Sequence, residues 1–184
     1  MSDWLAPVRS RLAAWDRGLS AWLVRRPPPH PQWDRLARLG AHLGDSWLWA
    51  LVGFLLWRMG RHAGLLRGAL VSLGVQVGVT LLLKQLVRRP RPGEGAFLYG
   101  SGPDVHSFPS GHAMRMTVIA LWASWQWPAW RSLYWAATAL VSWSRVRLGI
   151  HYAGDVMAGW LLGACIAIAV RHWGRHRSGQ RYSR

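Results

Sequence analysis

Acidic side chains and cysteine are both scarce in this sequence. Seven Asp and Glu residues stand against 23 Lys and Arg, which gives the 184 residues a formal net charge of +16. Charged residues make up only 16% of the chain, whereas about a quarter is usual for a soluble protein. The single cysteine, Cys165, excludes an intramolecular disulfide and leaves the redox compartment undecided. The low charged fraction argues against an ordinary soluble domain.

The residues that are abundant suit a membrane. Hydrophobic residues make up 51% of the chain, and 15 residues are tryptophan. Mean hydropathy is nevertheless only +0.05, because the scale scores Trp and Arg unfavourably although both suit the membrane–water interface. Basic residues lie between the apolar runs and in the C-terminal tail, which fits anionic headgroups and phosphate better than nucleic acid. We therefore expect a membrane protein that binds no nucleic acid.

Residues 1–26 predict an amphipathic helix and not a cleavable signal. In the segment 3–24 the apolar residues recur at intervals of three and four: Trp4, Leu5, Val8, Leu12, Trp15, Leu19, Trp22 and Leu23. Arg and Asp residues occupy much of the other face and would interrupt the apolar core of a signal. The helix either lies in the membrane interface or packs on the domain as an ordinary surface helix. The proline-rich residues 27–31 then end it.

Five apolar stretches follow this helix. They are residues 43–59, 63–86, 113–128, 131–146 and 154–171. A crossing needs about 20 residues, and roughly 17 can suffice, so five stretches joined mostly by short links predict about five transmembrane helices. The expected fold is all-α, a polytopic membrane helical bundle formed by residues 27–171. The N-terminal amphipathic helix precedes it, and residues 172–184 form a basic tail.

The basic residues of the connections indicate an orientation. The arginines near 58–67, Arg131 and the tail from Arg171 to Arg184 share one side of the predicted bundle. The positive-inside rule places such residues in the cytoplasm. In a bacterium this predicts a multi-pass protein of the inner (cytoplasmic) membrane, with the opposite end of the bundle facing the periplasm or exterior.

Three polar segments fall at that outer end, because successive crossings alternate in direction. Residues 84–92 follow the second crossing, residues 109–112 precede the third, and residues 144–155 join the fourth to the fifth. The first two segments bound the loop 87–112, which is the only long polar insertion between crossings. Loops of this length in a compact protein are usually functional. We expect the active site here.

The cations and small residues of these segments suit phosphate binding. Lys84 and Arg91 lie seven residues apart, about two helical turns, and can share a helix face. Arginine offers a planar fork to two phosphate oxygens, and lysine offers a point charge. Ser110 and Gly111 precede an expected helix, whose free N–H groups and dipole favour an anion.

Two histidines and an aspartate complete a set that could transfer a phosphoryl group. His151 and Asp155 are four residues apart, so the carboxylate reaches the imidazole if a helix begins there. An aspartate that holds one ring nitrogen leaves the other unprotonated and nucleophilic. His112, in the neighbouring segment, can protonate the departing oxygen. These three are the expected catalytic residues.

Together the three segments resemble the type 2 phosphatidic acid phosphatase superfamily. The resemblance rests on Lys84 with six residues before Arg91-Pro92, on Pro109-Ser110-Gly111-His112, and on Ser144-Arg145 with five residues before His151 and three more before Asp155. That family includes lipid phosphate phosphatases, undecaprenyl diphosphate phosphatases, lipid A phosphatases, glucose-6-phosphatase and soluble vanadium haloperoxidases. The helical pattern extends the similarity from about residue 40 to 171.

The resemblance implies an integral-membrane lipid phosphatase with a helical-bundle fold, a site near the outer membrane surface and inhibition by vanadate. It implies His151 as the nucleophile that forms a phosphohistidine, His112 as the general acid and Asp155 as the orienting partner of His151. The implied phosphate ligands are Lys84, Arg91, Ser110, Gly111 and Arg145. It implies neither a cofactor nor a metal.

The substrate and the fate of the phosphoryl group stay open at this level. Phosphatidate, phosphatidylglycerophosphate and undecaprenyl diphosphate are all candidate lipid phosphates. A phosphotransferase would pass the phosphoryl group to another lipid or sugar, and a non-catalytic protein would only bind anionic lipids. Haloperoxidase chemistry shares the site, but the membrane spans and short chain argue against it. The sequence indicates no oligomeric state.

Some polar residues near these segments have two interpretations. Arg115, one turn after His112, is a possible accessory residue that either extends the phosphate site or reaches the interface. Asp104 and His106 either control access to the site or are only surface residues of the loop. The remaining histidines show no metal-ligand spacing; they are His30, His42, His62, His172 and His176.

Overall fold

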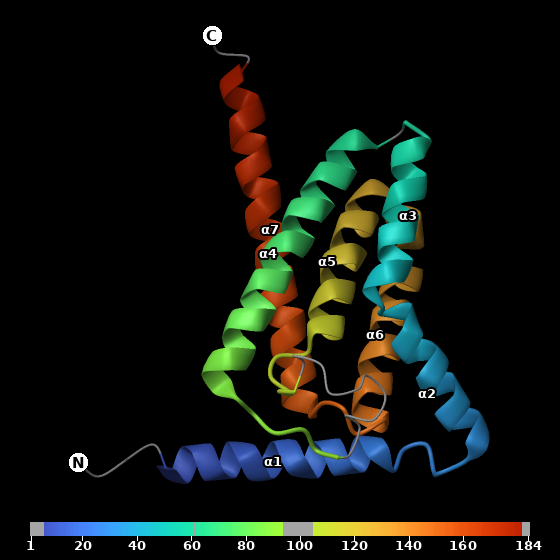
Figure 1. Ribbon diagram of the computed structural model, residues 1–184, viewed down its shortest axis with the longest axis vertical. Coiled ribbons are helices and arrows are strands. Elements are labelled where there is room, and N and C mark those ends of the chain that lie inside the picture. The colour runs from blue at the N-terminus through green and yellow to red at the C-terminus, as the bar shows by residue number, and fades with distance from the viewer. Residues whose placement is uncertain (1–5, 61, 94–104, 182–184) are drawn as a thin grey trace.

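The structure is a computed structural model, which describes residues 6–60, 62–93 and 105–181. Its helices are α1 (Ala6–Val24), α2 (Pro31–Leu43), α3 (Ser46–Arg58), α4 (Ala63–Val87), α5 (Gly111–Gln126), the 3₁₀ helix η2 (Pro128–Trp130), α6 (Arg131–Arg147) and α7 (Ala153–Arg181). Helix α5 packs against α4, α6 and α7, and α1 lies across one end of the bundle (Figure 1). The predicted all-α helical bundle is confirmed.

Helices α3 to α7 correspond to the five predicted apolar stretches. Helix α7 is longer than expected, because it continues to Arg181 instead of ending at residue 171. The loss of apolar residues at that point does not end a helix, since arginine is a good helix former. Part of the predicted basic tail is therefore helical and projects beyond the bundle (Figure 1).

Helix α2 was not predicted, although the proline run that ends α1 also starts it. Pro31 occupies the first helical position, where the missing N–H of proline has no cost. The Nδ1 atom of His30 accepts a hydrogen bond from the main-chain N–H of Gln32 and caps the helix. Helices α2 and α3 then meet at a bend of 50°. Gly44 and Asp45 form the connection between them.

Two of the described helices, α4 and α7, are long and apolar enough to cross a membrane. Their best segments have mean hydropathies of 1.7 and 1.8, and the bent pair α2–α3 is a third candidate. Helices α5 and α6 have only 16 and 17 residues, which at 1.5 Å per residue are shorter than a bilayer core of about 30 Å. The predicted number of five crossings therefore stays a prediction.

The distribution of polar residues on α4 is the reverse of that in a soluble protein. Every fourth residue of one face is polar and buried: Ser72, Gln76, Thr80 and Lys84. The opposite face exposes Leu81, Leu82 and Leu86. Exposed apolar side chains are stable in lipid, where packing and hydrogen bonds hold helices together. The exposed apolar face and buried polar face of helix α4 therefore suit a lipid environment.

Helix α1 shows the same inversion at the end of the bundle. Its buried side chains are polar, Asp16 and Ser20. Four of its apolar side chains, Val8, Leu12, Trp15 and Trp22, are at least half exposed, whereas Leu23 packs against the core. A surface helix on a soluble domain would bury such residues. The interfacial position of residues 1–26 stays a prediction.

Glycines allow α7 to pack closely on α5, the central helix. Gly159 and Gly163 lie four residues apart, and the fully buried Ala167 continues the spacing. A Cβ atom at Gly163 would lie 2.6 Å from the main-chain oxygen of Met114, and one at Gly159 would lie 2.7 Å from that of Ser110. Small residues at this spacing permit close helix contact in membranes. The contact holds the start of α7, which carries Asp155, against the start of α5.

We expect Gly163→Ala to destabilise the protein, because the added methyl group meets main-chain atoms that cannot move independently of α5. The expected loss is about 1–3 kcal/mol, measured as a lower midpoint of thermal unfolding in detergent. Gly74→Ala on α4 is the matched control, since no atom lies within 4 Å of its added methyl group. Equal midpoints for the two variants would contradict this view of the packing.

Candidate active site

The structure brings the three polar segments together at the end of the bundle that α1 crosses. The main-chain N–H of Ser107 donates to the main-chain oxygen of Arg89 over 2.9 Å, which joins the first segment to the loop before α5. The N–H of Ser110 donates to the main-chain oxygen of Asp155 over 3.0 Å, which joins that loop to α7. These contacts place the starts of α5 and α7 beside the end of α4.

His151 is buried in the turn between α6 and α7, and one of its ring nitrogens is fixed. Its Nδ1 atom lies 2.6 Å from the main-chain oxygen of Ser107. A carbonyl oxygen only accepts hydrogen bonds, so Nδ1 must carry the proton. In the neutral ring the other nitrogen, Nε2, then has a free lone pair. The contact thus selects the tautomer that a nucleophile needs.

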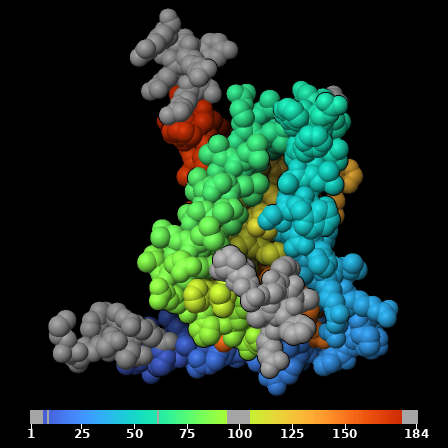
Figure 2. All heavy atoms as spheres, viewed as in Figure 1, coloured from blue at the N-terminus to red at the C-terminus, as the bar shows by residue number. Residues whose placement is uncertain are grey.

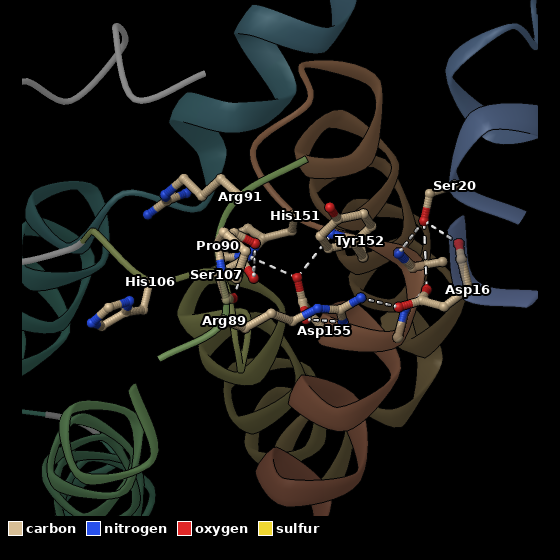
Figure 3. Close-up of polar contacts among 12 residues, drawn as sticks. Asp16, Ser20, Arg89, Pro90, Arg91, His106, Ser107, His151, Tyr152 and Asp155 are labelled. Carbon is tan, nitrogen blue, oxygen red and sulfur yellow. Dashed lines mark hydrogen bonds and ion pairs between the residues drawn. The ribbon is translucent and has the colours of Figure 1, made fainter. Parts of the chain in front are cut away.

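Asp155 lies on the same side of the ring, at the third position of α7. One carboxylate oxygen, Oδ2, accepts the main-chain N–H of Tyr152 over 2.8 Å, an arrangement that resembles a capping box. The same oxygen lies 3.7 Å from Nδ1 of His151, beyond hydrogen-bond distance. The carboxylate therefore acts on the imidazole as a nearby charge, while the Ser107 carbonyl makes the hydrogen bond (Figure 3).

The surroundings of His151 favour its neutral form. Burial lowers the pKa of His151 to about 4, and the charges of Arg145 and Arg91 act in the same direction. The negative charge of Asp155 opposes them. The imidazole is therefore unprotonated at neutral pH and available as a nucleophile.

His112, at the start of α5, has an acidic partner that the sequence did not reveal. Its Nε2 atom lies 3.2 Å from a carboxylate oxygen of Asp45, in the bend between α2 and α3. Gly44 makes this approach possible, because a Cβ atom there would lie 2.6 Å from the His112 ring. His112 and His151 are close enough to act on each other electrostatically.

The basic residues among the predicted phosphate ligands lie near the two histidines or contact the segments that hold them. Nζ of Lys84 donates to the main-chain oxygen of His106, the residue before Ser107. Nη1 of Arg91 donates to the main-chain oxygen of Ile150, the residue before His151, over 3.1 Å. Arg145 is buried and its charge acts on both His112 and His151.

The start of α5 supplies the remaining predicted ligands. Ser110 is the N-cap of α5, and its hydroxyl oxygen accepts the N–H of Ala113 over 3.4 Å. Gly111 packs against α4, where its added Cβ would lie 3.3 Å from Thr80. Nη1 of Arg115 donates to the main-chain oxygen of Gly44 over 2.5 Å, so this arginine braces the bend that holds Asp45.

Four groups at the site were not predicted: the Ser107 carbonyl, Asp45, Arg89, which forms an ion pair with Asp155, and Asp16, which forms an ion pair with Arg89. Because acidic residues are scarce in this chain, Asp45 and Asp16 could have been singled out as candidates from the sequence. A main-chain oxygen could not, because every residue has one. Of the doubtful loop residues, His106 contributes its main-chain oxygen and Asp104 lies outside the described residues. No cluster of three His, Cys, Asp or Glu side chains that could hold a metal occurs in residues 6–60, 62–93 and 105–181.

The fold is shared with two proteins of known structure. One is the PAP2-type phosphatidylglycerolphosphate phosphatase of Bacillus subtilis, with a TM-score of 0.73 and 24% identity over 90% of this chain and 87% of that one. The other is Aquifex aeolicus LpxE, with a TM-score of 0.68 and 21% identity over 82% of this chain and 91% of that one. At these identities the similarity concerns the fold.

The family model of the PAP2 superfamily matches residues 65–178, which include all three polar segments. The chain belongs to the PAP2 superfamily. The family prediction is therefore confirmed. The expected roles of the individual site residues stay predictions.

Named relatives of this PAP2 protein are phosphatases. Decaprenylphosphoryl-5-phosphoribose phosphatase of Mycobacterium tuberculosis is 32% identical over 169 residues, which are 86% of this chain and 88% of that protein. Undecaprenyl-diphosphatase of Sulfolobus acidocaldarius is 40% identical over 72 residues, 39% of this chain and 35% of that one. Lipid A 1-phosphatase of Rhizobium johnstonii is 35% identical over 96 residues, 47% of this chain and 38% of that one.

We expect the His151 ring to remain neutral, with its proton on Nδ1, down to about pH 5. The folded-state pKa lies below the unfolded value of about 6.5, so His151 contributes stability above that pH which is lost as the pH falls toward about 4. Nitrogen-15 NMR of histidine-labelled protein measures both tautomer and pKa, with His151→Gln assigning the signal. A titration near pH 6.5, or a proton on Nε2, would contradict the geometry.

Proposed function

We propose that this PAP2 protein hydrolyses a phosphate group of a long-chain lipid through a phosphohistidine on His151. The observation that carries the proposal is the imidazole held through Nδ1, which leaves Nε2 as the nucleophile in a site with Arg91, Arg145 and His112. The lipid phosphatase activities of the named relatives support the class of reaction. No step of the proposed mechanism uses a metal or a cofactor.

The reaction has two displacements at phosphorus. In the first, Nε2 of His151 attacks the phosphorus atom, the N–P bond forms and the P–O bond to the lipid breaks, while His112 gives its proton to the departing oxygen. In the second, the oxygen of a water molecule attacks the phosphorus atom while His112 takes a proton from the water. The new O–P bond forms, the N–P bond to His151 breaks, and inorganic phosphate and the neutral imidazole are released. Lys84, Arg91 and Arg145 balance the charge on the phosphate oxygens in both steps.

Asp45 stabilises the protonated form of His112 that the first displacement consumes. Its carboxylate, 3.2 Å from Nε2, holds one ring nitrogen and leaves Nδ1 for the leaving oxygen. The ring hydrogen bond of His112 thus goes to a carboxylate, whereas that of His151 goes to a neutral carbonyl oxygen.

An apolar groove beside the site fits the chain of a lipid. It has a volume of about 780 Å³ and runs between α3 and α4, with Phe54, Trp57 and Leu70 in its walls. Gln76 and Arg115 line it as well, and Gln76 packs close to Gly111. Figure 2 shows α5 at the bottom of the hollow between α3 and α4. The end of the groove at Gln76 therefore lies next to Gly111, one of the proposed phosphate ligands.

Among lipid phosphates, we favour a phosphate carried on a polyprenyl lipid. The Mycobacterium tuberculosis relative, a decaprenylphosphoryl-5-phosphoribose phosphatase, is similar over most of both chains. The undecaprenyl-diphosphatase also acts on a polyprenyl substrate. The long groove between α3 and α4 suits such a chain. Phosphatidate and phosphatidylglycerophosphate are the competing substrates.

We place the site at the outer face of the bacterial inner membrane. The site and the α7 C-terminus, with Arg171 and Arg175, lie at opposite ends of the bundle (Figure 1). The positive-inside rule puts the basic end of α7 in the cytoplasm. Helix α1, with its outward apolar face, would then lie in the outer interface beside the site.

We expect purified protein in detergent to release inorganic phosphate from a polyprenyl-linked phosphate, and His151→Ala to abolish the release. The panel of substrates includes phosphatidate, phosphatidylglycerophosphate and undecaprenyl diphosphate, each measured with and without EDTA. Activity should continue in the chelator, because the proposed steps use only side chains and water. Externally added short-chain lipid phosphate should be hydrolysed by intact cells if the site faces outward.

The outcomes of this assay separate the alternatives. Turnover that survives His151→Ala, or that EDTA stops, would overturn the phosphohistidine mechanism. Phosphate release that requires an added lipid or sugar acceptor would indicate a phosphotransferase. Binding of the lipid without any turnover would indicate a non-catalytic lipid-binding protein. Hydrolysis only after the cells are opened would place the site in the cytoplasm.

We expect Asp45→Asn to slow hydrolysis of lipid phosphates by roughly tenfold to a hundredfold, at or below the lower end of the range for proton transfer by a positioned group, because His112 itself remains. Hydrolysis of p-nitrophenyl phosphate should change little, because its departing phenolate needs no proton. The comparison of kcat for the two substrates checks this. An equal loss on both substrates would show that Asp45 does not act through the acid His112.

A further inference from the structure

Asp155 has a second charged neighbour besides His151. Its Oδ1 atom accepts a hydrogen bond from Nη1 of Arg89 over 2.7 Å. Nη2 of the same guanidinium donates to Oδ2 of Asp16, also over 2.7 Å. Arg89 thus lies between the buried carboxylate of the site and a carboxylate of α1, as the dashed lines in Figure 3 show. The guanidinium also stacks on the Tyr152 ring, 4.0 Å from its centroid.

Helix α1 also caps the start of α7. The N–H groups at a helix start have no partners within the helix, and a side chain just before the helix usually satisfies them. Here the caps come from a different helix. The N–H of Ala153 donates to the hydroxyl of Ser20 over 2.9 Å, and the N–H of Gly154 donates to Oδ1 of Asp16 over 2.7 Å. Asp16 therefore holds both Arg89 and the backbone turn that carries Asp155.

A glycine in α7 makes this contact possible. A Cβ atom at residue 154 would lie 2.9 Å from Oδ2 and 3.1 Å from Cγ of Asp16. Any other residue would push the carboxylate away from Arg89 and from the helix start. The chain thus has a small residue where Asp16 must approach.

The charges of the cluster keep Arg89 ionised. Burial would lower the pKa of Arg89, but the hydrogen bonds and charges of Asp16 and Asp155 outweigh burial and raise the pKa. An arginine fork can serve two carboxylates at once because its N–H groups are fixed in one plane. Loss of either carboxylate would leave the guanidinium with a partly unpaired charge in a half-buried place.

We propose that Asp16 is a positioning residue of the reaction, which acts through Arg89 on Asp155 and hence on the nucleophile His151. The proposal rests on the proposed phosphohistidine function. Asp16 touches neither the phosphate ligands nor His151, so it should affect the chemical step and not the binding of substrate. It also makes α1, whose apolar face points outward, a part of the active site.

The orientation of Asp155 matters because two arrangements are open to its carboxylate. While Asp16 shares the guanidinium, Oδ1 faces Arg89 and Oδ2 stays on the His151 side. Without Asp16 the positive charge of Arg89 is directed at Asp155 alone and the carboxylate is drawn toward it. The other charged groups around His151 are Arg91 and Arg145, together with His112, and none of them contacts Asp16. The effect of Asp16 must therefore pass through Arg89 or the start of α7.

The first experiment compares Asp16→Asn with Asp34→Asn in the lipid phosphatase assay. Asp34 is a matched control, because it also joins an arginine of another helix, Arg147, but lies outside the site. We expect kcat of Asp16→Asn to fall roughly tenfold with KM unchanged, and both constants of Asp34→Asn to stay at the wild-type values. A wild-type kcat for Asp16→Asn, or a loss confined to KM, would overturn the proposal.

The second experiment tests the route by a double-mutant cycle with Asp155→Asn. If Asp16 acts through Asp155, adding Asp16→Asn to Asp155→Asn lowers kcat no further. A purely structural role would make the two losses multiply, and that result would overturn the proposal. Gly154→Ala provides an independent perturbation should Asp16→Asn not fold, with the same loss of kcat expected. Its control is Gly18→Ala on α1, where no atom lies within 4 Å of the added methyl group.

The wild-type and His151→Ala proteins, assayed in parallel, keep the two proposals apart. If wild-type activity survives loss of His151, the proposed function is wrong whatever Asp16 does. If activity depends on His151 but Asp16→Asn and Gly154→Ala both match their controls, only the role of Asp16 is wrong.

Discussion

The hydrogen bond from Nδ1 of His151 to the main-chain oxygen of Ser107, 2.6 Å long, is the contact on which the rest of the site depends. It fixes the tautomer of the imidazole and also its orientation. Ser107 can serve as acceptor because the first segment holds it in turn: its N–H donates to the Arg89 oxygen and its hydroxyl to the Pro90 oxygen, over 2.9 and 3.0 Å. The three polar segments therefore assemble around one imidazole, and the helix contacts behind them keep the assembly in place.

The chain has only seven acidic residues, and those that the structure describes connect separate parts of the bundle. Each of the four described aspartates joins helices or segments distant in the sequence. Asp16 and Asp155 meet at Arg89, Asp34 meets Arg147, and Asp45 meets His112. In a chain of net charge +16, a carboxylate placed between cations reduces their mutual repulsion and fixes their positions. The aspartates thereby fix the positions of Arg89, Arg147 and His112 within the bundle.

The sequence predicted α3 to α7 and the three polar segments of the candidate site because both are local patterns. Apolar runs located α3 to α7, and the spacing of residues such as His151 and Asp155 indicated chemistry without any coordinates. Helix α2 was missed because Pro31 ends one pattern and begins another. The partners Asp45 and Asp16 were missed because they lie 67 and 73 residues from His112 and Arg89 along the chain. The Ser107 contact uses a main-chain oxygen, which any residue type provides.

The isomer of the trapped phosphohistidine tests the central claim most directly. Wild-type protein is mixed with a phosphorus-32-labelled lipid phosphate, quenched in alkali within one turnover, and digested for mass spectrometry. With Nδ1 hydrogen-bonded to Ser107, the phosphoryl group should be found on Nε2 of His151. A phosphoryl group on Nδ1 of His151, on His112, or on no histidine at all would contradict the account.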